Sequence, residues 1–284
     1  MLSVERFTDP GPFLDTAGPF LAEREAEHNL IFGISANLSL DPGGSAGPPY
    51  LAAVTRGASV VGAALMTPPH NLVLSCMDDP AAPSALAHDL AAHGSPLPGV
   101  TAPVDIARSF VEDWAAAHSV TARRTIEERI YRTQRVVPPT GVHGRARVAT
   151  AADREILIAF TRAFLREALD LSGDDAGDFV DGALRSGTRQ FHLWDDDGPV
   201  SLVGVGGRTP NGIRIGPVFT PTERRGHGYA SALTAFVTQA QFDEGRRFVF
   251  LFTNIANATS NKIYQAIGYE AVIDIDQWTF EAAT

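Results

Sequence analysis

The stretch PTERRGHGYASAL, residues 221–233, places two arginines and two glycines directly before a segment that turns helical. The first N–H groups of a helix have no partner within the helix and carry the positive end of its dipole. Glycines before such a helix let an anion come close to these groups. The stretch therefore predicts a phosphate-binding turn. The residues alone leave one alternative open, a surface loop whose arginines are solvated.

The segments that follow this turn alternate between helix and strand. Residues 229–245 carry apolar residues on one face, which is typical of an amphipathic helix. The apolar run FVFLFT, 248–253, predicts a strand buried on both faces, and a second helix is expected over 258–267, before Gly268. YEAVIDID and QWTFEA are then expected to form two further strands.

The segments that precede the turn complete the same domain. GRARVATAAD indicates a short strand and a helix start, with Thr150 or Asp153 near the cap. A short helix is expected around 179–184, after the acidic turn DLSGDDAGDF. QFHLWDDDGPVSLVGVGGRT and NGIRIGPVFT indicate three antiparallel strands, because Asp/Gly and Pro/Asn/Gly turns separate their apolar runs.

The first half of the chain repeats this order of elements. A hairpin is expected in PYLAAVTRGASVVGAALMTPP, followed by strand, helix, strand, helix and a final strand up to the Pro/Gly-rich linker VVPPTGVHGRAR. The bridge DDPAAPSAL, which takes the place of the glycine turn, has no arginine. We therefore predict two related domains, residues 1–140 and 141–284, of which only the second keeps the phosphate-binding turn.

Composition limits the possible settings and partners. The formal charge of −10 argues against broad nucleic-acid binding, and the apolar run SVVGAALM is far shorter than the roughly 20 residues of a membrane helix. Cys76 is the single cysteine, so no disulfide framework is expected. The N-terminus lacks the pattern of a signal peptide, so a cytoplasmic protein is expected, with no nucleic-acid or membrane partner. The sequence leaves its oligomeric state open.

Two motifs in this order resemble those of the GCN5-related N-acetyltransferases, the GNAT family. The family pattern Q/R-x-x-G-x-G/A is filled by Arg225, Gly228 and Ala230, and the later Asn…Tyr…Gly-Tyr pattern by residues 257, 264, 268 and 269. GPVFTPTERRGHGYASAL and NATSNKIYQAIGY look like a bacterial branch of predicted acetyltransferases with a degenerate N-terminal GNAT-like domain. The resemblance covers about residues 145–284 and implies an α+β fold, a mixed, mostly antiparallel sheet flanked by helices, as two tandem GNAT-like domains.

The resemblance implies acetyl-CoA as cosubstrate and assigns residues to it. The pyrophosphate would lie on the backbone of Gly226, His227, Gly228, Tyr229, Ala230 and Ser231, with charge from Arg224 and Arg225. The pantetheine arm would pair with the strand around Val218, Phe219 and Thr220, where a backbone N–H would also stabilise the developing oxyanion. Asn257 and Ser260 would contact the same arm, and Tyr264 would protonate the departing thiolate.

Several of these residues also have structural interpretations. Asn257 is a natural helix N-cap, Tyr264 could be an ordinary half-buried aromatic residue, and His227 could be a solvated loop residue. Asn261 and Lys262 are expected to point to solvent. Cys76 is expected to be a core residue rather than an acyl-carrying nucleophile, and the histidine spacing predicts no metal site.

The general base is not predicted. Many relatives carry a glutamate on the fourth strand, but GIRIGPVFT has none. Glu167, Asp170 and the cluster Asp174, Asp175 and Asp178 lie in a region that lines the acceptor side in relatives. They could attract a cationic amine or relay its proton, or they could be a solvated loop that caps the next helix.

The resulting expectation is an N-acetyltransferase that transfers acetyl from acetyl-CoA to a primary amine by direct attack on the thioester. The amine belongs to a small molecule, such as an amino acid, or to a protein, and a longer-chain N-acyltransferase is a close variant. The alternative is an acetyl-CoA-binding sensor without turnover. The first domain would either cover the acceptor cleft or stabilise the sheet edge.

Overall fold

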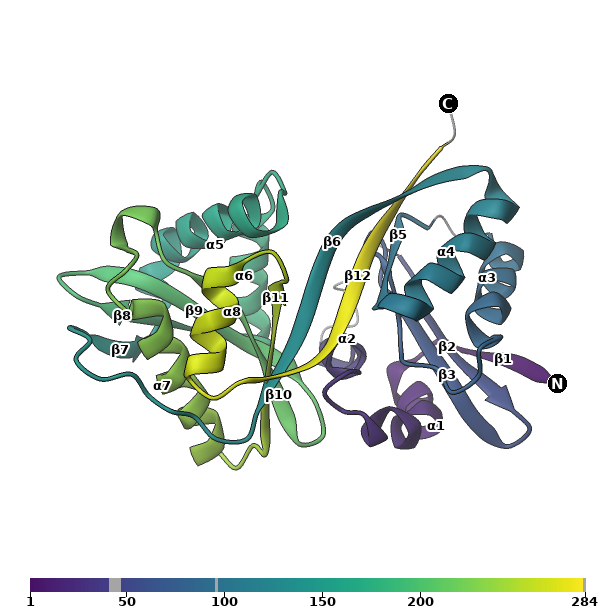
Figure 1. The fold of residues 1–284 in the computed structure, drawn as a ribbon, viewed down its shortest axis with the longest axis horizontal. Coiled ribbons are helices and arrows are strands. Elements are labelled where there is room, and N and C mark those ends of the chain that lie inside the picture. Colours follow the sequence, from purple (N-terminus) through teal and green to yellow (C-terminus); the bar gives the residue numbers. More distant parts are fainter. Residues whose placement is uncertain (41–46, 95–96, 283–284) are drawn as a thin grey trace. The chain divides into compact units, whose positions relative to one another are not determined.

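The computed structural model describes residues 1–40, 47–94 and 97–282, which form two compact units (Figure 1). The first unit comprises residues 1–130 together with the C-terminal segment from Val272, and the second comprises residues 131–271. The division therefore differs from the expected one between residues 140 and 141. The C-terminal segment belongs to the first unit because residues 275–279 pair with a strand of that unit, at residues 99–103.

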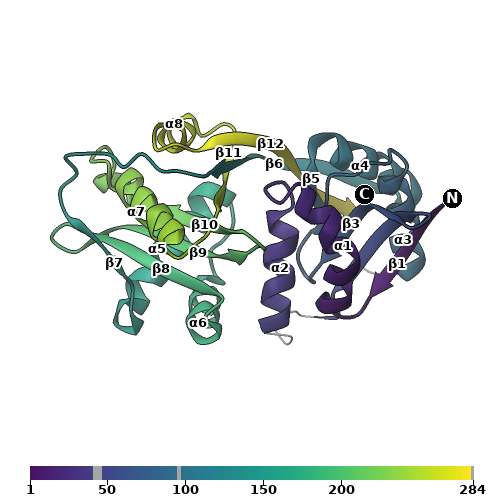
Figure 2. The same ribbon diagram turned by 90° about the horizontal axis from the view of Figure 1, so that it is seen from below.

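The second unit holds the predicted phosphate-binding turn and is a five-stranded sheet between helices. Its sheet order is β11-β10-β9-β8-β7, antiparallel except for the parallel pair β10–β11. Helices α5 and α6 cover one face of this sheet, and α7 and α8 cover the other (Figure 2). The elements are β7 (Arg145–Val148), α5 (Arg154–Leu169), α6 (Ala176–Ser186), β8 (Arg189–Asp195), β9 (Pro199–Arg208), β10 (Gly212–Phe219), α7 (Tyr229–Asp243), β11 (Phe248–Asn254) and α8 (Ala258–Ala266).

The first unit repeats this arrangement. Its sheet order is β1-β2-β3-β4-β5, again antiparallel except for the last pair, and α1 and α2 cover one face while α3 and α4 cover the other. The elements are β1 (Leu2–Phe7), α1 (Pro10–Glu23), α2 (Asn29–Leu40), β2 (Tyr50–Arg56), β3 (Ser59–Met66), β4 (Leu72–Leu74), α3 (Ala82–His93), β5 (Gly99–Pro103), α4 (Val104–His118) and β6 (Val120–Thr133). The predicted fold class, a mostly antiparallel α+β fold present twice, is confirmed.

The last strand corrects one expectation. β12 (Glu270–Ala282) is a single strand, whereas YEAVIDID and QWTFEA were expected to form two. The ladder with β5 runs without a break from Ile275 to Thr279, through the point where the two strands were to separate. No Gly, Pro or Asn stands there to make a turn.

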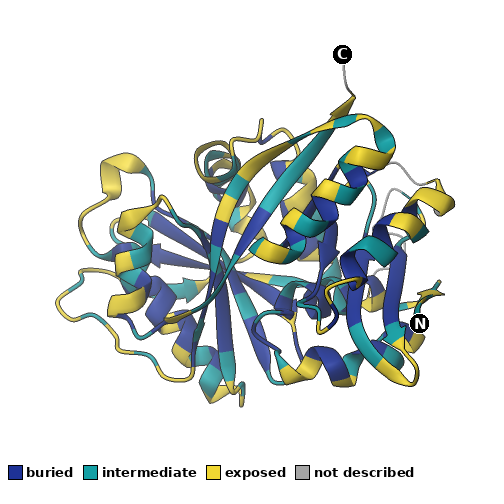
Figure 3. Cartoon of the chain, turned by 45° about the vertical axis from the view of Figure 1, so that its right-hand side comes forward, coloured by how far each residue is buried: buried dark blue, intermediate teal, exposed yellow. Residues whose placement is uncertain are grey.

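Local sequence explains where the helices around the site begin. The sequence placed Thr150 or Asp153 near the cap of α5, and both take part: the Thr150 side chain and the Asp153 carboxylate form a reciprocal capping box before this helix. Arg147 binds Asp153 at 2.8 Å and Asp195 at 2.5 Å, which ties this cap to the sheet. The central strands of each sheet are mostly buried, whereas the helices expose their outer faces (Figure 3). The turn before α7 therefore lies at the start of a helix that packs on buried strands.

Candidate functional site

The turn that leads into α7 is built around two glycines with left-handed backbone angles. Gly226 and Gly228 both have φ of 83°. A β-carbon at Gly228 would lie 3.0 Å from Cγ2 of Val142, whereas nothing lies within 4 Å of one at Gly226. Glycine at both positions lets the chain make this turn without the strain that a side chain would bring.

A run of free backbone donors follows from this turn. The N–H groups of residues 226–231 form no hydrogen bond with any part of the protein that the structure describes. The first bond of α7 runs from the N–H of Ala232 to the C=O of Gly228, at 2.9 Å. Residues 224–227 are exposed. Consecutive free amides at the positive end of a helix form a site for an anion such as a pyrophosphate, so these residues fit the group that the sequence predicted.

Arg225 is held beside this run by its own unit. Its Nε donates to the C=O of Thr220 at 2.9 Å, and its Nη2 lies 2.6 Å from Oε1 of Glu167. Its guanidinium also lies over the Phe219 ring, 6.0 Å from the ring centre. Arg224 is exposed and forms no ion pair within the described chain. Arg225 is therefore positioned by a carboxylate and a carbonyl, while Arg224 faces water.

The side chains of His227 and Tyr229 have local partners. The Nδ1 atom of His227 lies 3.0 Å from the C=O oxygen of Arg225, and its ring stacks on Tyr229 at 5.4 Å. The Tyr229 hydroxyl donates to the Asp196 carboxylate, and this bond raises the pKa of Tyr229. What these two residues offer an anion directly is their backbone N–H.

Strand β10 separates from β11 beside the turn. The ladder between them pairs residues 212–214 with residues 248–250, and none of the described residues beyond Arg214 extends it. On its other side β10 pairs with β9 again at Val218 and Phe219, after a bulge at residues 216–217. Residues 215–219 thus have an edge that β11 does not occupy. This edge includes Val218 and Phe219, where the family resemblance places the pantetheine arm. Thr220 is buried, and its hydroxyl lies 2.9 Å from that of Ser201.

The start of α8 shows which interpretation of Asn257 the structure supports. Its Oδ1 accepts a hydrogen bond from the N–H of Ser260 at 3.0 Å, so it is the N-cap of the helix. Asn261 does not point to solvent as expected, because its Nδ2 donates to the C=O groups of Asn254, Ile255 and Asn257 at 2.8–3.2 Å. Contact of Asn257 or Ser260 with a pantetheine arm stays a prediction.

Tyr264 is buried on the inner face of α8. Its ring lies 6.4 Å from that of Tyr131 and 6.1 Å from that of Tyr269. Burial raises the pKa of Tyr264, so its hydroxyl keeps its proton at neutral pH. The hydroxyl has no hydrogen-bond partner in the part of the chain that the structure describes. Tyr264, Tyr229 and Val218 pack in the same cluster of buried residues, so α8, the turn before α7 and β10 share one core.

The acidic residues considered for the general base are exposed. Glu167 is engaged by Arg225, and Asp170 ends α5 at a left-handed φ of 53°. The cluster at residues 174, 175 and 178 lies just before or within the first turn of α6. Cys76 is half-buried, and burial raises the pKa of its thiol, which disfavours the reactive thiolate.

The first unit has a different arrangement at the start of α3. There the Asp79 carboxylate accepts a hydrogen bond from the N–H of Ala81 at 3.0 Å and is paired with Arg56. The carboxylate of Asp79 therefore occupies the start of α3, and no glycine precedes this helix in DDPAAPSAL.

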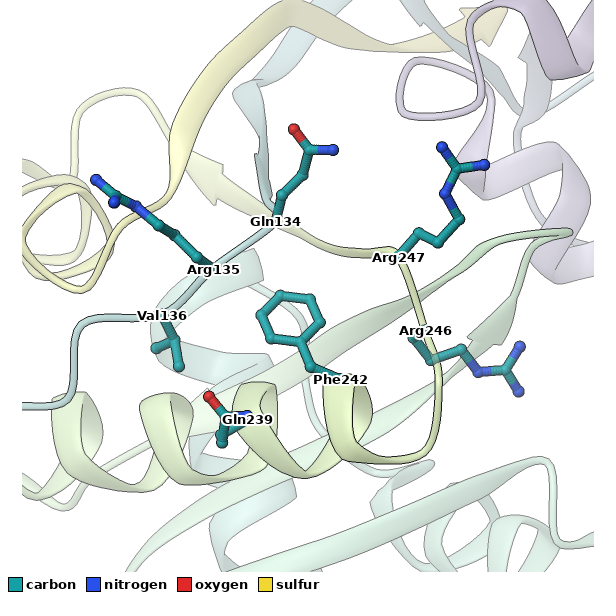
Figure 4. Close-up of a pocket in the computed structure, with 7 residues that line it drawn as sticks. All are labelled: Gln134, Arg135, Val136, Gln239, Phe242, Arg246 and Arg247. Carbon is teal, nitrogen blue, oxygen red and sulfur yellow. The ribbon is translucent and has the colours of Figure 1, made fainter.

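A groove lies at the C-terminal end of α7. It is an open groove of about 490 Å³ lined by Gln134, Arg135, Val136, Gln239, Phe242, Arg246 and Arg247. The guanidinium groups of its three arginines point away from one another (Figure 4), so they do not converge on one ligand.

Two arginines that the sequence did not single out lie on the α5/α6 face of the sheet. Arg189 begins β8, and Arg214 lies in β10. No motif distinguishes them from the other arginines of the chain, because only strand pairing brings them together.

Comparison with known proteins supports the predicted resemblance. Residues 198–279 match the family model described as FR47-like protein. Among solved structures, a Drosophila protein superposes with a TM-score of 0.71 at 11% identity and covers 99% of both chains. A GCN5-related N-acetyltransferase from Sphaerobacter thermophilus gives 0.60 at 14% identity, covering 98% of this chain and 95% of its own.

A tandem GNAT protein from the clavulanic acid biosynthesis pathway, solved without acetyl-CoA, gives a TM-score of 0.58 at 15% identity and covers 100% of this chain and 99% of its own. No curated protein matches the sequence. The predicted resemblance to GNAT proteins is thus confirmed, and the chain has their fold in tandem.

Within residues 1–40, 47–94 and 97–282, no helix is long and apolar enough to cross a membrane. No three His, Cys, Asp or Glu side chains of these residues are placed to hold a metal ion.

Proposed function

We propose that this protein is an acetyl-CoA-dependent N-acetyltransferase that acetylates a primary amine. The observation that carries the proposal is the run of free amides at residues 226–231, which opens beside the uncovered edge of β10. A protonated, buried Tyr264 on the same core supports catalysis rather than binding alone, because a sensor has no need of an acid for the leaving group.

The donor would be held by backbone rather than by side chains. The amides of residues 226–231 would bind the pyrophosphate, and Arg224 would add charge from its exposed position. Residues 218–220 of the β10 edge would pair with the amide groups of the pantetheine arm. This leaves the thioester carbonyl beside a strand whose backbone N–H can stabilise negative charge on its oxygen.

The reaction would then transfer the acetyl group from sulfur to nitrogen in one step. The amine nitrogen attacks the thioester carbonyl carbon, the C–N bond forms and the C–S bond breaks, with its electron pair passing to sulfur. Tyr264 donates its phenolic proton to that sulfur, which releases the thiol. The attacking nitrogen loses one proton to water, because β10 carries no carboxylate and Glu167 is engaged by Arg225. Tyr264 takes a proton back from water, which restores the protein for the next turnover.

The test combines binding with turnover. Calorimetric titration with acetyl-CoA should show one site per chain, and thiol release over a panel of small amines and lysine peptides should identify an accepted amine. Binding without thiol release over the whole panel would instead favour the acetyl-CoA sensor. Absence of binding would refute the proposed site.

A further inference from the structure

Arg189 and Arg214 lie in one row across the sheet of the second unit. Both pair with Gly206 of β9, Arg189 from β8 and Arg214 from β10. Both lie on the face covered by α5 and α6, since the Arg189 guanidinium lies 5.4 Å from the Phe179 ring centre of α6 and the neighbours of Arg214 in β10, Ile213 and Ile215, pack on the opposite face. Two strand spacings separate their Cα atoms by about 10 Å.

Strand β9, which lies between β8 and β10, has glycines rather than side chains beside the two arginines. A β-carbon at Gly204 would lie 2.8 Å from the C=O oxygen of Gly216, and one at Gly207 would lie 3.1 Å from Nη2 of Arg214. Across this bare stretch the Arg189 guanidinium donates to the C=O of Gly216, at the bulge of β10. The glycines of β9 thus make room for two guanidinium groups on this face.

Arg189 has no acidic partner among the residues that the structure describes. Burial and the neighbouring charge of Arg214 lower the pKa of Arg189 to about 9. Arg147 and Arg154, by contrast, each bind two carboxylates. Removing a charge from water without a counter-charge is unfavourable, so an anionic ligand would stabilise the arrangement.

The row lies next to the place where the acyl group is expected. Gly216 precedes Val218 by two residues, a distance of roughly 7 Å along the strand. A short molecule that carries both an amine and an acid group would connect the two positions.

We propose that the acceptor is a small amine bearing a carboxylate, of the amino-acid class, and that Arg189 binds this carboxylate with added positive charge from Arg214. The inference rests on the proposed acetyl transfer and assigns its acceptor. It also gives Arg189 a function beyond its contacts with Gly216 and Phe179, which would by themselves be structural.

The experiment compares acceptors that differ only in the carboxylate. Glycine is paired with glycinamide, and L-phenylalanine with phenethylamine, each assayed by thiol release and by calorimetric titration into the protein saturated with CoA. The same measurements are made on Arg189→Gln, on Arg189→Lys and on the control Arg185→Gln, an exposed arginine at the end of α6. Acetyl-CoA affinity is measured on every variant.

The inference predicts that at least one carboxylated acceptor binds more than tenfold tighter than its neutral partner. Arg189→Gln should abolish this preference by raising KM for that acceptor more than tenfold, Arg189→Lys should recover part of it, and Arg185→Gln should behave like the natural protein. Acetyl-CoA affinity should be unchanged in all three variants, which would also show that each is folded.

Equal or weaker binding of both carboxylated acceptors overturns the inference, as does a preference that survives Arg189→Gln. Acetylation of neutral amines alone would overturn it and leave the proposed acetyl transfer intact. If the natural protein does not bind acetyl-CoA, the proposed function itself fails.

Discussion

Substitution of Gly228 by glutamate tests the anion site most directly. Gly228 precedes the first residue of α7 at φ 83°, and a β-carbon there meets Val142 at 3.0 Å. Adopting the left-handed backbone costs a side chain about 1–2 kcal/mol, so we expect the free energy of unfolding to fall by roughly this amount. The fold should remain, because the turn is exposed or half-buried.

The effect on acetyl-CoA should be larger than the effect on stability. The new carboxylate would stand at the positive end of α7, among the free amides of residues 226–231. A like charge about 5 Å from the pyrophosphate, at an effective dielectric constant near 20, raises the free energy of binding by about 3 kcal/mol. We expect the acetyl-CoA affinity, measured by calorimetry, to fall more than a hundredfold.

Gly245→Glu is the matched control. Gly245 follows the same helix at its other end, with φ 89° and nothing within 4 Å of a β-carbon. The substitution Gly245→Glu brings the same side chain, charge and backbone strain as Gly228→Glu. Its Tm should therefore fall by as much as that of Gly228→Glu, while its acetyl-CoA affinity stays within about twofold of the natural protein. Equal affinity losses in the two variants, or none in Gly228→Glu, would show that the cofactor does not lie on these amides.

Three further predictions concern other residues of the second unit. Tyr264→Phe should lower kcat on an accepted amine about a hundredfold. Its acetyl-CoA affinity and Tm should be unchanged, because the hydroxyl has no partner in the described chain. An unchanged kcat would exclude Tyr264 as the acid. Glu167→Gln should lower the KM for acetyl-CoA two- to threefold, by releasing Arg225 from an exposed ion pair, and a tenfold loss of kcat would instead assign the base to Glu167. His192 is buried, and burial lowers its pKa to about 4, below its unfolded value of 6.5, so the unfolded chain binds more protons between these values. The contribution of neutral His192 to the free energy of unfolding, about 3 kcal/mol, is complete above pH 6.5 and is lost as the pH falls to 4. In denaturant titrations, His192→Leu should therefore lose about this much less stability over the same pH range than the natural protein. Identical pH profiles of stability in the two proteins would contradict the prediction.

Local patterns in the sequence identified most elements of the second unit. The capping box at Thr150 and Asp153, the amphipathic face of α7 and the apolar run of β11 all act over a few residues, so they can be recognised without the fold. The start of the chain shows how such a pattern can be overlooked. Asp9 caps α1 by accepting from the N–H of Gly11 at 2.7 Å, directly before a proline, yet no helix was expected there.

The arginine–glycine turn was also predictable, because its chemistry comes from backbone at adjacent residues. Two left-handed glycines and a helix start suffice to expose a run of amides, and all of them lie within residues 226–231. The Asn257 cap is local in the same way. What the sequence could not show was the engagement of Arg225 by Glu167, 58 residues away.

The sequence by itself thus determined the elements of the second unit, the repeat of its fold in the first and the glycine turn before α7, since each depends mainly on residues that are neighbours along the chain. Tertiary structure decided what depends on pairing between distant strands. The pairing of β12 with β5 assigns the C-terminal segment to the first unit, because a strand's partner is selected by register and burial as well as by its own residues. Likewise Arg189 and Arg214 become one charged row only because both pair with Gly206, a relation that no spacing in the sequence records.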